Sequence, residues 1–295
     1  MSFTVNTNVG AMAALQSLNQ TNRDMSQVQS RINTGLNVAS TKDDSAKFVI
    51  AEKLRGDIAG FQAVTSSLNN AKSVTDVAIA GTEQISNLLG QMRAKATEAS
   101  DTGLDQASRD TIAKDLTSLK KQIATIISSS EFNGVNLLKT GGGTVGALKS
   151  LQDGDSATAG HQADTLAVAN TGLQGTIETA HGTGGTGGGL GTAGADITLT
   201  NATAADELID DIDVVMGSVK DQLSNLGSAS RTVNAQLKFT SKLADVVEAG
   251  IGNLVDADLA KESAKLQALQ VKTQLGLQAL SIANQAPQSI VSLFR

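Results

Sequence analysis

A long heptad repeat lies in the C-terminal half of the chain, where residues 208–254 read LIDDIDVVMGSVKDQLSNLGSASRTVNAQLKFTSKLADVVEAGIGNL. Its seam positions recur at steps of three and four for more than six heptads, at Leu208, Ile212, Val215, Val219, Gln222, Leu226, Ala229, Val233, Gln236, Thr240, Ala244, Val247, Ile251 and Leu254. At about 1.5 Å per residue, this spacing predicts one α-helix of roughly 70 Å. Because a 3.5-residue seam requires a facing seam, we expect lateral partner helices.

The N-terminal half contains seams that can face this helix. One predicted helix, bounded by Gly10 and Gly35, carries apolar or polar seam residues at Ala11, Leu15, Leu18, Asn22, Met25, Val28 and Ile32. Residues 68–126 hold two further stripes separated by the turn sequence DTGLD, which predicts an αα-hairpin. Cap oxygens for its first helix are available from Ser40, Thr41, Asp43 and Asp44. The predicted class is mainly α, a long antiparallel coiled-coil bundle formed by the N- and C-terminal segments.

Residues 140–202 differ in composition, being rich in Gly, Thr, Ala and Asp. The run GTGGTGGGLGTAG, at 182–194, can neither bury a face nor hold a helix, because glycine is entropically costly to order and offers no side chain. The alternating stretch DITLT, at 196–200, predicts edge strands. We therefore expect a small, Gly-rich, partly β insert at the surface.

The composition argues against several protein classes. Six Phe and no Trp or Tyr are too few large side chains for a compact globular core of 295 residues. A net charge of −6 without Lys/Arg clusters argues against nucleic-acid binding. The sequence has no run of 18 apolar residues and no basic N-terminal region followed by an apolar run, so neither membrane insertion nor a cleaved signal is expected. The lack of cysteine excludes disulfides and thiolate metal sites.

Three features have the residue types of a catalytic or metal site. Residues 182–187 match GxGxxG, but more glycine follows instead of the helix that a phosphate site needs, which favours a flexible loop. The two histidines, His161 and His181, match no metal-ligand spacing. An acidic cluster consists of Asp206, Glu207, Asp210, Asp211 and Asp213. It has no basic or nucleophilic partner in sequence and is interpreted as capping the start of the long helix. We predict no enzyme activity, no cofactor and no metal.

Both ends of the chain are apolar, helix-patterned and nearly uncharged. The first 41 residues hold only Arg23, Asp24 and Arg31 as charged side chains, and the last 30 hold only Lys272 and Arg295. Apolar residues of the last helix also lie off its seam, at Val271, Leu275, Leu277 and Ile282. Because exposed apolar surface of this extent usually marks an interface, we expect both ends to be buried by other copies of the chain.

Specific motifs occur near both ends. They include Asn33-Thr-Gly35-Leu36, Ala39-Ser-Thr-Lys42-Asp43-Asp44-Ser-Ala46, FNGVNLL at 132–138, Asp256-Ala257-Asp258 and ANQAPQ at 283–288. With these motifs the chain resembles bacterial flagellin, the filament subunit of the flagellum. The resemblance covers about residues 1–139 and 203–295.

The resemblance implies a structural subunit that self-assembles into the helical flagellar filament for motility. It assigns residues 1–40 and 254–295 to the inner filament core, 41–139 and 203–253 to a middle helical domain, and 140–202 to a variable surface insert. It also implies type III export without a cleaved signal and an extracellular location. The implied partners are further copies of the chain, alone or with other flagellins, an export chaperone and a filament cap.

The helix pattern and the resemblance together suggest residues for filament assembly: Leu15, Leu18, Met25, Ile32, Leu266, Leu269, Leu275, Leu280, Asn284 and Gln285. We expect the terminal helices to stay disordered in the free subunit and to order when the growing tip buries them. Some flagellins are recognised by a vertebrate innate receptor through an Arg, a Leu and a Glu of the middle helices. The corresponding positions here are Gln91, Lys95 and Asp115, so weak recognition is expected.

Two alternatives stay open from the sequence. A cell-surface polysaccharide-binding protein of flagellin type would use the Gly/Thr-rich insert, although glycan sites usually use aromatic faces and no Phe lies between Phe132 and Phe239. A hook-filament junction protein has similar ends, but the ANQxPQ ending favours flagellin.

Overall fold

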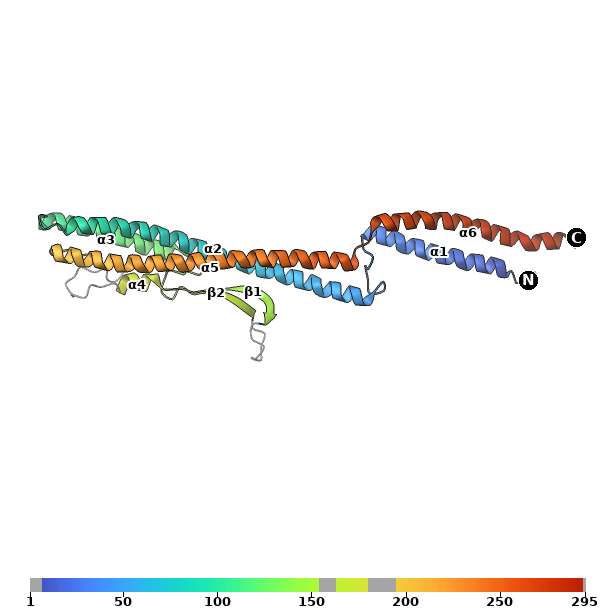
Figure 1. Ribbon diagram of the computed structural model, residues 1–295, viewed down its shortest axis with the longest axis horizontal. Helices are drawn as coiled ribbons and strands as arrows, with labels where there is room; N and C mark the ends of the chain where they lie inside the picture. Colours follow the sequence, from blue (N-terminus) through green and yellow to red (C-terminus); the bar gives the residue numbers. More distant parts are fainter. Residues whose placement is uncertain (1–6, 154–162, 180–194, 294–295) are drawn as a thin grey trace. The chain divides into compact units, whose positions relative to one another are not determined.

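A computed structural model of the chain describes residues 7–153, 163–179 and 195–293 (Figure 1). Its elements are α1 (Val9–Thr34), α2 (Ser45–Ala99), α3 (Gln106–Ser129), β1 (Val145–Asp153), β2 (Ala163–Val168), α4 (Leu173–Thr179), α5 (Ala202–Val255) and α6 (Leu259–Leu293). The chain divides into two compact units, residues 1–58 with 245–295 (unit 1) and residues 59–244 (unit 2). The predicted class, mainly α with a small partly β insert, is confirmed.

Unit 2 is built on a three-helix core. The heptad seam predicted from the sequence falls in α5, where Leu208, Ile212 and Val215 are fully buried. These side chains share one hydrophobic cluster with residues of α2 and α3, among them Ile85 and Leu116. The predicted αα-hairpin therefore supplies the facing seam, as the 3.5-residue periodicity requires.

A buried arginine fixes the turn between α2 and α3. Arg109 Nε donates to Ala99 O (3.0 Å), and its Nη2 donates to Asp101 O (2.6 Å). These carbonyl oxygens lie at and just beyond the C-terminus of α2, where helix carbonyls lack partners along the helix. The positive charge also suits the negative end of the helix dipole. The sequence pattern predicted this turn at DTGLD but did not identify Arg109.

The turn after α3 follows from its Asn-Gly pair. Phe132 and Val135 exchange two backbone hydrogen bonds, both of 3.0 Å. Between them Asn133 and Gly134 have φ values of 51° and 80°. A two-residue turn with both central residues at positive φ favours Asn followed by Gly, because these residues adopt that conformation most readily.

The next residue, Asn136, is a buried hydrogen-bonding hub. Its Nδ2 donates to Ile127 O in the last turn of α3 (2.6 Å). Its Oδ1 accepts from the backbone N–H groups of Leu138 and Lys139 (both 2.9 Å). The side chain therefore joins the end of α3 to the loop that enters the insert.

The insert, which the sequence predicts at the surface, also contributes side chains to the core. Strands β1 and β2 pair antiparallel, with Val145 opposite Val168. Buried residues of the insert belong to the unit 2 cluster, namely Val145, Ala147, Val168, Leu173, Ile177, Ile197 and Leu199. The sequence does not show this contribution, because isolated apolar residues in a polar stretch do not reveal what they pack against.

The predicted edge strand at residues 196–200 is wrong. This segment forms no strand and is instead held by side chains of α3. Thr117 Oγ1 accepts from Ile197 N (2.9 Å), while Lys120 Nζ donates to Ala195 O (3.0 Å). Burial of the Lys120 ammonium lowers its pKa. The alternating pattern thus reflects apolar residues inserted into a helical core rather than strand pairing.

The acidic cluster does not cap α5, contrary to its predicted role. Asn201 Oδ1 accepts from Ala204 N (2.8 Å), and the first turn of α5 contains no acidic residue. Asp213 instead pairs with Arg93 of α2, through Nε–Oδ1 (2.6 Å) and Nη2–Oδ2 (3.1 Å). His161, His181 and the GxGxxG match at 182–187 lie outside the described residues.

Candidate assembly surface

The two terminal helices, α1 and α6, lie side by side in unit 1 (Figure 1). They run in opposite directions. Near one end of the pair, Asn8 Nδ2 donates to Ala283 O (2.7 Å), and near the other Arg31 Nη1 lies 3.5 Å from Glu262 Oε1. The antiparallel pairing thus joins segments from the two ends of the sequence.

Local sequence determines where the two helices begin and end. Asn8 Oδ1 accepts from Ala11 N (3.0 Å), and Gly35 ends α1 in the left-handed conformation with φ 72°. Asp258 Oδ1 accepts from the N–H groups of Ala260 and Lys261 (both 3.1 Å) at the start of α6. Asn and Asp suit an N-cap because their side chains accept from unpaired helix N–H groups, and Gly tolerates the left-handed C-cap.

The seam between α1 and α6 is thin. Among the side chains that the structure describes, through residue 285 of α6, its buried apolar residues are Leu18 and Val28 of α1 and Leu269 of α6. Gly276 allows a close approach: a Cβ placed there would lie 3.3 Å from Leu18 Cδ1. Two helices with so few large buried side chains bury little apolar area in each other.

Much apolar surface on this helix pair is therefore uncovered. The exposed large apolar residues of the two helices are Val9, Met12, Leu15, Leu259, Val271, Leu275, Leu277 and Ile282. Ile282 is 68% exposed and Leu275 is 58% exposed. Contiguous helices that present this many apolar side chains to solvent are typical of interaction surfaces.

The residues predicted for assembly divide between the seam and this uncovered surface. Leu18 and Leu269 are buried in the seam, and Met25, Ile32, Leu266 and Leu280 are half-buried. Leu15, Leu275, Asn284 and Gln285 are exposed. Sequence reasoning missed Val9 and Met12, which lie on the first turn of α1 beside the predicted seam.

A short connection holds the helix pair to the start of α2 and the end of α5 within unit 1. The backbone N–H groups of Asn37 and Val38 donate to Val255 O (2.7 and 3.2 Å). Ala257 N donates to Gly35 O (2.8 Å). Val38 and Val255 also belong to a small hydrophobic cluster with Ala51 and Ile251.

The positions that the resemblance links to receptor recognition lie on exposed helix surface in unit 2. Gln91 is exposed, and Lys95 Nζ lies 2.8 Å from Asp115 Oδ2 across α2 and α3. This hydrogen bond raises the pKa of the Lys95 ammonium. The bond from Arg93 to Asp213 likewise raises the pKa of the Arg93 guanidinium. The structure brings Lys95 and Asp115 together as a surface ion pair.

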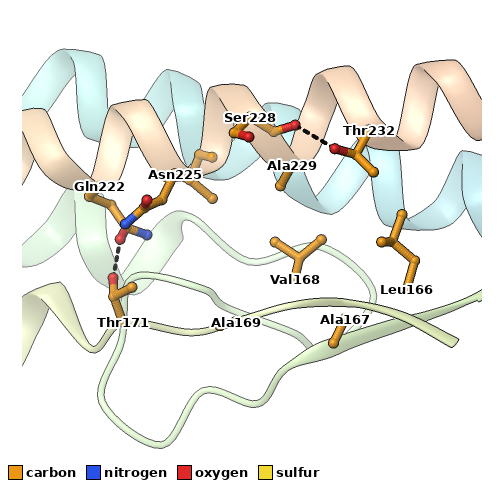
Figure 2. A pocket seen from close by; sticks show the side chains of 11 residues that line it. Leu166, Ala167, Val168, Ala169, Thr171, Gln222, Asn225, Ser228, Ala229 and Thr232 are labelled. Atoms are coloured by element: carbon orange, nitrogen blue, oxygen red, sulfur yellow. Dashed lines mark hydrogen bonds between the residues drawn. The ribbon is translucent and has the colours of Figure 1, made fainter.

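A groove of about 310 Å³ lies between β2 and α5 in unit 2 (Figure 2). It is lined by Leu166, Ala167, Val168, Ala169, Thr171, Gln222, Asn225, Leu226, Ser228, Ala229 and Thr232. At one end Thr171 Oγ1 donates to Gln222 Oε1. The lining residues carry no charge, so the groove offers no carboxylate, imidazole or ammonium group as a general acid or base.

Two further features are absent from the described part of the chain. Among these residues, no group of three or more His, Asp or Glu side chains is placed to hold a metal ion. Within the same residues, no helix is both long and apolar enough to cross a membrane.

Comparison with known proteins places the chain beside one family along its whole length. The family model described as the bacterial flagellin N-terminal helical region matches residues 5–141, and the C-terminal helical region matches residues 209–294. The chain is 42% identical to flagellin FljM and 43% identical to flagellin FljK of Caulobacter vibrioides, each over 291 residues that cover 99% of this chain and 98% of the relative. It is 32% identical to flagellin C of Rhizobium meliloti over 318 residues, which cover 98% of both chains.

Proposed function

This chain belongs to the bacterial flagellin family, and from that premise we propose how its two ends build the filament. The protein is a structural subunit that self-assembles into the helical flagellar filament. The observation that carries the proposal is the uncovered apolar surface of α1 and α6. No observation on the described residues favours the polysaccharide-binding or hook-filament junction alternatives.

We propose that neighbouring copies cover this surface in the filament. Burial of apolar area contributes about 25 cal/mol per Å², which offsets the entropy of ordering the terminal segments. Contacts between different faces of identical subunits generate an open helical polymer when the rotation from one copy to the next does not close a ring, as we propose here. In this proposal the α1–α6 pair is the assembled form of the two ends, and the same segments are disordered in the free subunit.

We also propose the domain boundaries, the export route and the partners of the subunit. Residues 1–40 and 254–295 form the inner core, residues 41–139 and 203–253 form the middle helical domain, and 140–202 form the outer insert. Export proceeds through the flagellum's own channel, so the subunit acts outside the cell. Before assembly the apolar ends need a cover, which supports an export chaperone and a filament cap as partners. Catalysis is not part of the proposal, because flagellin is a structural family.

Removal of residues 266–295 is expected to abolish assembly and to leave a helical, monomeric subunit. The deletion takes away most of α6 and with it the exposed Val271, Leu275, Leu277 and Ile282, while the unit 2 core is untouched. Salt-induced assembly of full-length and shortened protein, compared by electron microscopy and sedimentation, measures the effect. Fibres formed by the shortened protein would show that the terminal assignment is wrong.

Recognition by the vertebrate receptor is expected to be weak. Lys95 replaces the apolar residue of recognised flagellins, and its ammonium is engaged by Asp115 at 2.8 Å. The purified monomer should therefore activate receptor-bearing reporter cells at least about tenfold less than a recognised flagellin, since loss of two or three contact side chains costs more than about 1.4 kcal/mol. Activation equal to that of the recognised flagellin would refute this expectation.

A further inference from the structure

One ion pair stands apart from the others in the described part of the chain. Arg31 of α1 and Glu262 of α6 have side chains that are 21% and 11% exposed, while seven other ion pairs there have both partners at least 30% exposed. The pair sits between two helices that carry few charges. A partly buried ion pair between two such helices is unusual, and its role needs a physical explanation.

Stability alone does not explain the pair. Taking two charges out of water is costly, and the cost is recovered only when their remaining polar atoms are satisfied. Within the described part of the protein, Arg31 Nε and Glu262 Oε2 are buried without a hydrogen-bond partner. An apolar pair of similar size would serve stability at least as well. The best-attested use of a buried polar pair between helices is to specify their register.

The seam has an ambiguity that this pair can resolve. In the observed register Leu18 faces Gly276, and Arg31 faces Glu262. A slip of seven residues in one direction would place Leu18 opposite Ala283, and a slip in the other would place it opposite Leu269. Both alternatives keep small or apolar residues in contact, so the apolar seam discriminates weakly between registers.

The ion pair discriminates strongly between the observed register and the slipped registers. In the first slipped register Arg31 would face Leu269, and in the second it would lie beyond the start of α6 at Leu259, so in both the charge loses its partner. The helix dipoles also favour both charges at these positions, because the positive Arg31 lies in the last turn of α1 and the negative Glu262 lies in the first turn of α6. The backbone hydrogen bond from Ala257 N to Gly35 O (2.8 Å), just beyond the ends of both helices, favours the same register. We infer that Arg31 and Glu262, acting together with this connection, set the register in which the two terminal helices pair, and thereby fix which apolar side chains the subunit presents to its neighbours.

The register can be measured with engineered disulfides, because the chain has no native cysteine that would compete. A Cβ at position 276 would lie 4.0 Å from Leu18 Cβ, within the range that a disulfide requires. Leu18→Cys with Gly276→Cys therefore reports the observed register. Leu18→Cys with Leu269→Cys, or with Ala283→Cys, reports a slip of seven residues in either direction. Each pair is oxidised in assembled full-length filaments, and mixing with isotope-labelled copies separates disulfides within one chain from those between chains.

Each reporter is placed in three backgrounds: the native pair, Arg31→Met with Glu262→Leu, and the exchanged pair Arg31→Glu with Glu262→Arg. With the native pair, the observed-register disulfide should dominate. With the apolar pair, the ratio of slipped to observed disulfides should rise at least about tenfold, because the register penalty of an unpaired buried charge is gone. The exchanged pair should restore the native ratio. If the apolar background keeps the native ratio, the inference is overturned.

Loss of assembly is also decisive. If the apolar pair fails to assemble and the exchanged pair assembles, pairing of opposite charges is required, as inferred. If both fail, the pairing is not what matters and the inference is overturned. The inference rests on the proposed pairing of the terminal helices in the filament. If the terminal helices do not pair in the filament, none of the three disulfides would form in filaments that keep the native Arg31 and Glu262, which is a different result from a change of register.

Discussion

Leu275→Glu is expected to raise the protein concentration needed for filament assembly by at least about a hundredfold. Leu275 is 58% exposed on α6, so the subunit loses little by the change, and glutamate is a good helix former. In the filament the change removes about 1.5–3 kcal/mol of apolar burial and also buries an unpaired charge, and each 1.4 kcal/mol is about tenfold. Polymer pelleted as a function of total protein concentration measures the effect.

The matched control adds the same charge elsewhere. Thr144→Glu alters an exposed residue of the insert, and assembly should change by less than about threefold, as for most surface substitutions. Leu275→Ala should fall between the two, because it removes apolar area without adding charge. Normal assembly of Leu275→Glu would show that this side of α6 is not covered by neighbouring copies.

The long helices could be predicted from the sequence because their seams are regular. The heptad pattern predicted a helix through residues 208–254, and α5 spans Ala202–Val255. The sequence predicts that the first helix lies between Gly10 and Gly35. In the structure α1 spans Val9–Thr34, because Asn8 provides the N-cap. Seams of this length repeat one signal many times, so a single irregular position does not hide them.

Irregular segments could not be predicted in the same way. Ile197 and Leu199 have the pattern of an edge strand, but they are buried against helices. In place of a strand partner, Ile197 N donates to Thr117 Oγ1 and Leu199 O accepts from Gln106 Nε2, both side chains of α3. Arg109 was missed because it acts on carbonyl groups that only the folded turn brings near. Asn201 is a local N-cap, three residues before Ala204, and was missed because the acidic residues that follow it were interpreted as the cap. Long-range hydrogen bonds leave no periodic signal in the sequence.

The assembly surface could be predicted only in part. Periodicity places Leu15 and Leu18 on the same broad face of α1, since they are three residues apart. Only the packing shows that Leu18 is buried against Gly276 while Leu15 stays 48% exposed. The sequence therefore indicates which helices form the surface, whereas the contacts decide which side chains remain for a neighbouring copy.

Asn136→Ala is expected to lower the free energy of unfolding of the subunit by about 3 kcal/mol, because three buried hydrogen bonds contribute about 1 kcal/mol each and their partners lose them together. The side chain of Asn136 is the donor to Ile127 O and the acceptor for Leu138 N and Lys139 N. Its loss leaves a carbonyl at the end of α3 and two loop N–H groups without their partner. Urea unfolding of the shortened monomer lacking residues 266–295, followed by helix circular dichroism, measures the change without interference from assembly.

Asn70→Ala provides the control for this substitution. Asn70 lies on the exposed face of α2, so the same chemical change there should shift the free energy of unfolding by less than about 0.5 kcal/mol. A difference of about 3 kcal/mol between the two variants would place Asn136 among the residues that hold unit 2 together, next to the fully buried Leu137 and Leu138 that it positions. Equal stability of the two variants would mean that backbone contacts alone, such as Asn136 N to Gly142 O at 2.9 Å, suffice to close the loop after α3.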